Sequence, residues 1–319
     1  MQQYSARIHR RSMALFAAVF IAGAGCGRSR VTGVNDKRET GGPDTAIPFP
    51  IDRGGDGAVA PITYKGLPLQ LVDNGAPVVT PVDGVIGLVC TGMSNGVREC
   101  DDFRARVGGE YAGAINPQVR VVNCAVGGHA IEKWIDPSFD STLWDACISQ
   151  KIPAAGLRPD QVRVIWHKAA DQSNTAPGGG AKPPYPDAGS DYFAFYDHLT
   201  AFAARLPTKF PSVQAVYTSS RSYGGFAGNQ AARGEPLSYE EGHALNQWLM
   251  SHSTVTGVWY GWGAYLWAPS CANGITNGGG VCYVREDYVS DGVHPSASGQ
   301  QKISALLHAR FMKEAWYRP

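Results

Sequence analysis

Two short segments near opposite ends of the chain contain the residue types of a nucleophilic site. Ser94 lies in GLVCTGMSNG (residues 87–96), where an apolar run breaks into a turn with glycine on both sides of the serine. Asp291 and His294 lie in DGVHP (residues 291–295), a spacing that lets one short loop hold an imidazole with a carboxylate behind it. In such a set the histidine removes the serine proton and the carboxylate orients the histidine. Each segment also has an ordinary structural interpretation, Ser94 as a helix N-cap and His294 as a loop residue.

Two other segments could stabilise an anionic oxygen beside such a serine. Gly127 and Gly128 follow an apolar run and can present backbone N–H groups, although a Gly-Gly pair also serves as a simple turn. Lys168 follows a further apolar run, and its ammonium can act on an oxyanion as a point charge, although a lysine at a strand end is commonly solvated. The order of the four segments along the chain therefore supports a nucleophilic site more strongly than any single segment does.

A scaffold that gathers strand ends is needed to bring these residues together. The expected strands are Asp83–Cys90, Val119–Val126, Gln161–His167, Val213–Ser219 and Gly257–Trp262. The expected helices are Asp101–Val107, Ser141–Lys151, Asp191–Phe210, Ser238–Ser251 and Ser296–Trp316. Continuous apolar strands separated by helices indicate a parallel sheet covered on both faces, so we predict an α/β protein, a three-layer α/β/α sandwich with about five parallel strands. In such sheets functional groups gather at the carboxyl ends of the strands.

The amino terminus is typical of an exported protein. Arginines precede the apolar run Met13–Ala24, which is shorter than the roughly 20 residues of a membrane-spanning helix. We assign residues 1–25 as a signal peptide, 26–61 as a flexible tether rich in Gly, Asp and Pro, and 62–319 as one folded domain. Gly25-Cys26 is typical of a lipoprotein signal, whereas Ala22-Gly23-Ala24 fits ordinary cleavage.

The cysteine count favours lipidation of Cys26. The chain has seven cysteines, and removing Cys26 leaves an even number in a compartment where disulfides persist. Cys271 and Cys282 flank a loop rich in Gly and Asn and are the expected pair; the pairing of Cys90, Cys100, Cys124 and Cys147 stays open. We expect a secreted, periplasmic or outer-surface protein that contacts a membrane only through a lipid at Cys26. The formal net charge of +1 gives no argument for nucleic-acid binding.

The order of the four segments resembles the SGNH/GDSL hydrolase superfamily. Serine follows the first strand, glycine the second and polar groups the third, and D-x-x-H precedes the last helix. Gly92-Met93-Ser94-Asn95 is similar to the first motif of sialate O-acetylesterase-like members. The resemblance implies a flavodoxin-like fold and a serine esterase (EC 3.1.1 class) that needs no cofactor and no metal.

The resemblance also implies a role for each residue that matches a motif. Ser94 would be the nucleophile, His294 the general base and Asp291 its orienting partner. The N–H of Ser94 and that of Gly127 or Gly128 would form the oxyanion hole. Lys168 falls where the acetylesterase-like branch has its further donor.

Residues near the ends of the strands are candidates for contact with substrate. They are Asn95, Arg221, Tyr223, Trp262 and Trp267. Exposed aromatic rings there would form a stacking face for sugars, so we predict a secreted esterase that removes O-acetyl or other acyl groups from carbohydrate. Two alternatives stay open, a non-catalytic surface lipoprotein that binds glycan or a partner, and a general short-chain esterase or lipase.

Overall fold

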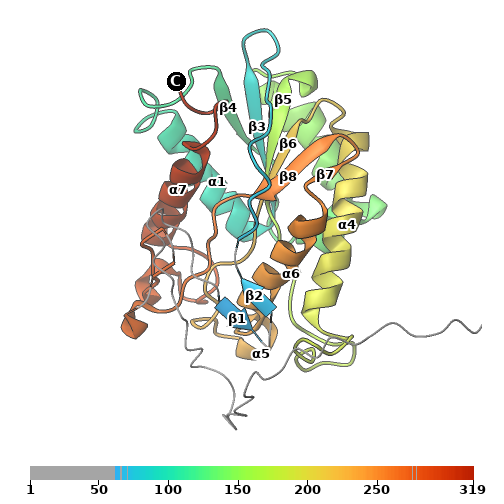
Figure 1. Cartoon of the computed structure of the whole chain (residues 1–319), viewed down its shortest axis with the longest axis vertical. Coiled ribbons are helices and arrows are strands. Elements are labelled where there is room, and N and C mark those ends of the chain that lie inside the picture. Colours follow the sequence, from blue (N-terminus) through green and yellow to red (C-terminus); the bar gives the residue numbers. More distant parts are fainter. Residues whose placement is uncertain (1–61, 65–66, 70, 275, 278) are drawn as a thin grey trace, which may run out of the picture. The chain divides into compact units, whose positions relative to one another are not determined.

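The computed structural model describes residues 62–64, 67–69, 71–274, 276–277 and 279–319 (Figure 1). The expected signal peptide, the tether and Cys26 lie outside the described residues. Within the described ranges, no helix has both the length and the apolar character needed to cross a membrane.

A six-stranded sheet in the order β4-β3-β5-β6-β8-β7 forms the centre of the described part (Figure 1). Its strands are β3 (Ile86–Gly92), β4 (Val119–Asn123), β5 (Val162–Lys168), β6 (Ala215–Ser219), β7 (Thr254–Val255) and β8 (Val258–Trp262). The first five strands in that order are parallel, and β7 is antiparallel to β8 at the edge. All five expected strands are present, which confirms the predicted parallel sheet. A separate antiparallel pair consists of β1 (Ile62–Tyr64) and β2 (Leu67–Leu69).

Helices cover both faces of the sheet and confirm the three-layer prediction. In Figure 1, α1 (Ser94–Val107) and α7 (Ala297–Phe311) lie on one side, and α4 (Asp191–Lys209) and α6 (Leu237–Ser251) lie on the other. The short helices are α2 (Ile131–Ile135), α3 (Ile152–Ala154) and α5 (Gln230–Arg233). The expected helix 141–151 consists of two π-helical turns, Ser141–Asp145 and Cys147–Lys151. The 3₁₀ turns are Pro137–Phe139, Pro159–Gln161, Cys271–Asn273 and Arg285–Asp287.

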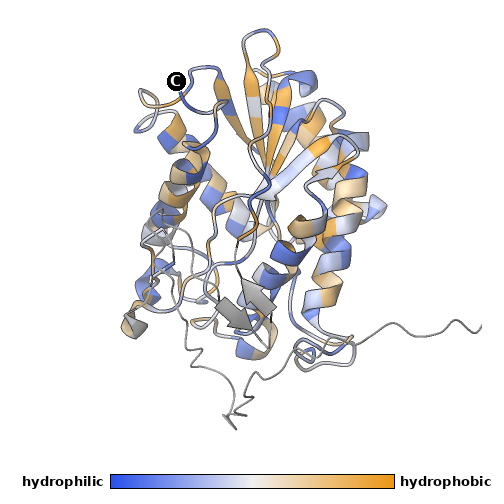
Figure 2. Cartoon of the chain, in the orientation of Figure 1, coloured by the Kyte–Doolittle hydropathy of each residue, from blue (hydrophilic) through white to orange (hydrophobic). Residues whose placement is uncertain are grey.

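The core consists of two apolar layers, one on each face of the sheet. Leu88 of β3 packs in the layer that includes Phe103 of α1 and Leu307 of α7, whereas Val89 packs with α4 and α6 on the other face. Because successive strand residues point to opposite faces and both faces are covered, the strands consist largely of apolar residues, with polar residues among them (Figure 2).

The strand order places the expected site residues at one point of the sheet. β3 is the first strand of the parallel sheet and lies between β4 and β5. The helix after β3 and the helix after β5, α1 and α4, cover opposite faces, so the ends of these two strands form the point at which such sheets bind ligands. In the register of β3 and β5, Gly92 is paired with Lys168.

Candidate active site

The turn that carries Ser94 requires a glycine at its start. Gly92 ends β3 with φ +135°, and a β-carbon there would lie 2.6 Å from the carbonyl oxygen of Lys168. Met93 is the N-cap of α1 and makes no side-chain cap, so Ser94 is the first helical residue and not the cap. The half-buried Ser94 hydroxyl is therefore available to another partner.

The structure brings Ser94, His294 and Asp291 together. Ser94 Oγ lies 2.7 Å from His294 Nε2, and His294 Nδ1 lies 2.5 Å from Asp291 Oδ2. The second carboxylate oxygen, Asp291 Oδ1, accepts hydrogen bonds from the backbone N–H groups of Val293 (2.8 Å) and His294 (3.0 Å). The D-x-x-H spacing thus fixes the carboxylate through its own turn, while the helix supplies the serine from the other end of the chain.

The charge of Asp291 determines which histidine nitrogen carries the proton. Burial acts to raise the pKa of Asp291, but hydrogen bonds from the His294 backbone, its imidazole and the Val293 backbone outweigh burial and lower the pKa to about 2. An ionised carboxylate only accepts hydrogen bonds, so His294 Nδ1 must donate to it. The lone pair of Nε2 then faces the Ser94 hydroxyl, which is the arrangement of a general base.

The loop that carries Asp291 and His294 is fixed by a glycine and by the segment after β6. Gly292 has φ +69°, and a β-carbon there would lie 1.7 Å from the carbonyl oxygen of Phe226. The Gly228 N–H donates to the Asp291 carbonyl at 2.9 Å. This close contact admits no side chain at residue 292 and holds the loop against the rest of the domain.

The segment after β4, which carries Gly127 and Gly128, lies next to Ser94. A β-carbon at Gly127 would lie 3.9 Å from Ser94 Cβ, so the segment after β4 is next to the serine. Among the described residues, neither the Gly127 nor the Gly128 N–H donates to a protein acceptor, and the Gly128 carbonyl accepts from Lys133 Nζ at 2.7 Å. Ser94 N–H belongs to the first turn of α1, where N–H groups lack helical partners and the helix dipole favours negative charge. Their use as an oxyanion hole stays a prediction.

Lys168, which the sequence led us to expect at the oxyanion, has an ammonium that is closed off from solvent and paired inside the protein. Its side chain is fully buried, and Nζ lies 3.4 Å from Oε1 of Glu99 in α1. Burial lowers the pKa of Lys168 and raises that of Glu99, while the attraction between the two charges opposes both shifts. Sequence analysis missed Glu99, although the spacing of Phe103 and Val107 places position 99 on the buried face of α1.

Four of the five expected substrate-contact residues are buried and already paired. Asn95 Nδ2 donates to the Val293 carbonyl at 3.0 Å, and the Arg221 guanidinium pairs with Glu241 at 2.9 Å. The prediction that these two side chains face substrate is corrected accordingly.

The two tryptophans do not form the expected stacking face. Trp262 and Trp267 are 4% and 3% exposed. Their indole N–H groups donate to Asn246 (2.8 Å) and Glu235 (3.0 Å), because β8 and the segment that follows it are covered by the rest of the domain. Tyr223 alone stays half-buried, with its ring edge-to-face against Phe226.

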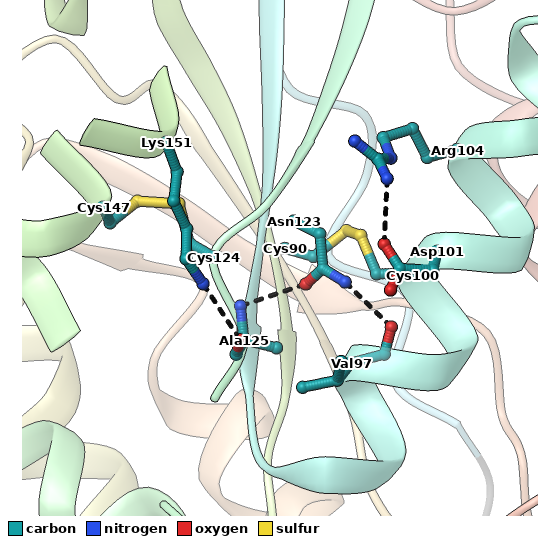
Figure 3. Close-up of a disulfide and its surroundings, with 10 residues drawn as sticks. All are labelled: Cys90, Val97, Cys100, Asp101, Arg104, Asn123, Cys124, Ala125, Cys147 and Lys151. Carbon is teal, nitrogen blue, oxygen red and sulfur yellow. Dashed lines mark hydrogen bonds and ion pairs between the residues drawn. A yellow bond between two sulfur atoms is a disulfide. The ribbon is translucent and has the colours of Figure 1, made fainter. Parts of the chain in front are cut away.

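Two disulfides flank the segments that carry Ser94 and Gly127 (Figure 3). Cys90 of β3 is bonded to Cys100 of α1, and Cys124, directly after β4, is bonded to Cys147. Between them, Asn123 accepts from the Ala125 N–H and donates to the Val97 carbonyl of α1 (Figure 3). The serine turn and the glycine segment are therefore tied to each other as well as to the sheet.

The third disulfide joins Cys271 and Cys282, the pair expected from the sequence. The three disulfides fit an extracellular protein. Within the described ranges, no group of three or more His, Cys, Asp or Glu side chains is arranged to hold a metal ion.

Comparison with known proteins gives structural neighbours only. No family model and no curated protein matches the chain. A GDSL-like lipase from Bacteroides thetaiotaomicron is 10% identical with a TM-score of 0.39, over 74% of this chain and 92% of that one. An acetyl xylan esterase is 10% identical with a TM-score of 0.40, over 70% of this chain and 98% of that one. At these identities and scores, the roles assigned below rest on the geometry of this chain.

Proposed function

We propose that this protein is a serine esterase that hydrolyses carboxylic esters through Ser94, His294 and Asp291. The observation that carries the proposal is the continuous chain of hydrogen bonds from the Asp291 carboxylate through the imidazole to the Ser94 hydroxyl, at 2.5 and 2.7 Å. This chain meets the amino terminus of α1, where a developing negative charge is stabilised.

The first half of the reaction forms an acyl-enzyme. Ser94 Oγ bonds to the ester carbonyl carbon as His294 Nε2 takes the hydroxyl proton, and the carbonyl oxygen becomes an oxyanion that accepts from the Ser94 and Gly127 N–H groups. Asp291 stabilises the imidazolium that forms. The tetrahedral intermediate then expels the alcohol, which takes the proton from His294 Nε2.

The second half releases the acid. A water molecule gives a proton to His294 Nε2 and its oxygen bonds to the acyl carbon. The same N–H groups hold the second oxyanion, and its collapse breaks the bond to Ser94 Oγ, which recovers its proton from the imidazolium. Atoms and charge balance with water as the only co-reactant.

The substrate class that we propose is an O-acylated carbohydrate with a short acyl group. Support comes from the similarity of residues 92–95 to the first motif of sialate O-acetylesterase-like proteins. Trp262 and Trp267 are buried and add no support. Tyr223 is therefore the remaining candidate ring for contact with a sugar, and it lies on the segment that contacts the Asp291 loop. We further propose that the enzyme acts outside the cytoplasm, in accord with its disulfides, and that Cys26 carries a lipid; mass spectrometry of the mature amino terminus tests the latter.

The test is an ester-hydrolysis assay of the purified protein and its Ser94→Ala variant. We expect hydrolysis of p-nitrophenyl acetate and of an acetylated polysaccharide, a slower reaction with a long-chain ester, and a loss of about 10⁴-fold or more in kcat for Ser94→Ala. Undiminished turnover by Ser94→Ala would overturn the nucleophile assignment. Glycan binding without turnover by the wild-type protein would support the binding-protein alternative instead.

A further inference from the structure

The aliphatic stem of Lys168 lies against the turn that carries Ser94. A β-carbon at Gly92 would lie 3.0 Å from Lys168 Cβ, and one at Gly96 would lie 3.1 Å from Lys168 Cβ and 3.5 Å from Cγ. The two glycines stand on either side of Ser94 in the sequence. The backbone of the serine turn therefore contacts the lysine stem directly, with no side chain between them.

The ammonium of Lys168 extends from this contact into α1. Nζ lies 3.4 Å from Glu99 Oε1, and both side chains are 0% exposed. Each group is the main opposite charge acting on the other; Arg221 and Glu241 also act on Lys168, and His294 acts on Glu99. A buried charge without a counter-ion is strongly unfavourable, and each of these two groups is therefore needed by the other.

The position of α1 affects both the nucleophile and the loop that carries the general base. Ser94 is its first residue, while Asn95 and Arg98 of the same helix donate to the carbonyls of Val293 and Pro295 at 3.0 and 3.4 Å. Those two carbonyls flank His294. A shift of α1 on the end of β5 would move the nucleophile and disturb the histidine loop at the same time.

We infer that Lys168 is a positioning residue for Ser94: its stem supports the turn between Gly92 and Gly96, and its ammonium fixes α1 through Glu99. The inference rests on the proposed esterase function, because Lys168 acts only through Ser94. It replaces the expectation that the lysine touches the oxyanion, since Nζ is enclosed with Glu99.

Four variants separate the stem from the charge. Lys168→Ala removes both, Lys168→Met keeps the stem and leaves the Glu99 carboxylate unpaired, and Glu99→Gln leaves the ammonium unpaired. The double variant Lys168→Met with Glu99→Gln keeps the stem and contains neither charge. Lys209→Met is the matched control, because Lys209 pairs with Asp140 at 2.7 Å at the carboxyl end of α4.

Three measurements are made on each variant: kcat and KM for p-nitrophenyl acetate, the second-order rate of Ser94 labelling by a fluorophosphonate, and the midpoint of thermal unfolding. For Lys168→Ala we expect kcat and the labelling rate to fall about 10²-fold with KM changed less than about threefold, since a displacement of about 1 Å costs that much. We expect the two single charge variants to melt lowest and the double variant to recover kcat to within about fivefold of wild type. Lys209→Met should keep the wild-type kcat.

Two results would overturn the inference. One is wild-type kcat and labelling in Lys168→Ala. The other is a double variant that melts like wild type and is as slow as Lys168→Ala, which would mean that the ammonium itself contacts the reacting oxygen. A wild-type protein inert to both the ester and the fluorophosphonate would instead remove the proposed function, and this inference with it.

Discussion

The two sides of the candidate active site are held by opposite kinds of interaction. The Asp291 and His294 side chains are 45% and 21% exposed, and they are oriented by hydrogen bonds within one four-residue turn. The Ser94 turn rests on a fully buried ion pair and on close backbone contact, and a disulfide joins the strand before it to the helix after it. The Asp291 and His294 side chains are thus oriented mainly by short polar contacts, whereas the Ser94 turn is held mainly by buried contacts.

The two sides meet at Asn95. Its amide connects the helix of the nucleophile to the carbonyl that precedes the histidine, across a gap of 198 residues in the sequence. We expect substitutions on the exposed side to change the chemistry with little loss of fold. Substitutions on the buried side should change both.

The largest effect is expected on the exposed side, from Asp291→Asn. The amide can donate to His294 Nδ1, which would place the proton on Nε2 and leave no base for Ser94; kcat should fall about 10⁴-fold. The thermal midpoint should change little. Asp136→Asn is the matched control, because Asp136 accepts the Ser138 N–H at 2.8 Å in a similar turn elsewhere. A wild-type kcat in Asp291→Asn would show that Asp291 does not orient His294 as proposed.

The next largest effect is expected on the buried side, from Gly92→Ala. The β-carbon would meet the Lys168 carbonyl at 2.6 Å, and the φ of +135° is strained for alanine. We expect kcat to fall about 10²-fold and the free energy of unfolding to fall by about 1–3 kcal/mol. Gly75→Ala, with φ +71° and open space around it, is the control for backbone strain alone. Equal effects of the two substitutions would argue against the close contact.

A smaller effect is expected at the junction, from Asn95→Asp. The carboxylate cannot donate to the Val293 carbonyl and repels it, so kcat should fall about tenfold at unchanged KM. Asn116→Asp removes a comparable bond, to the Trp316 carbonyl at 3.0 Å, and should leave kcat unchanged. If kcat is the same in both variants, the two sides are positioned independently.

The smallest effect concerns the pH dependence of stability. Because the pKa of Asp291 in the folded protein is lowered from 3.8 to about 2, its ionised form stabilises the fold above about pH 4, and this contribution is lost as the pH falls towards 2. The group is 45% exposed, so solvent screening keeps the effect small. We expect wild type to melt slightly above Asp291→Asn at pH 6 and at the same temperature near pH 2; a difference that persists at pH 2 would contradict this.

Much of the fold followed from local patterns. The five parallel strands were predictable because both faces of the sheet are covered, which makes each strand largely apolar. β7 was missed because its two residues carry no recognisable alternation. The helix expected at Asp101–Val107 in fact begins at Ser94, since the polar first turn of α1 has no apolar period.

The sequence by itself determined which residues follow which strand, and hence that Ser94 and the Asp291–His294 turn were candidates for one site. Tertiary structure alone decided where long side chains point. Lys168 turns into the core to meet Glu99, Asn95 holds the histidine loop, and Trp262 lies inside. The reason is physical: strand periodicity is set by neighbouring residues, whereas the partner of a buried polar group is set by helices and loops that arrive from distant parts of the chain.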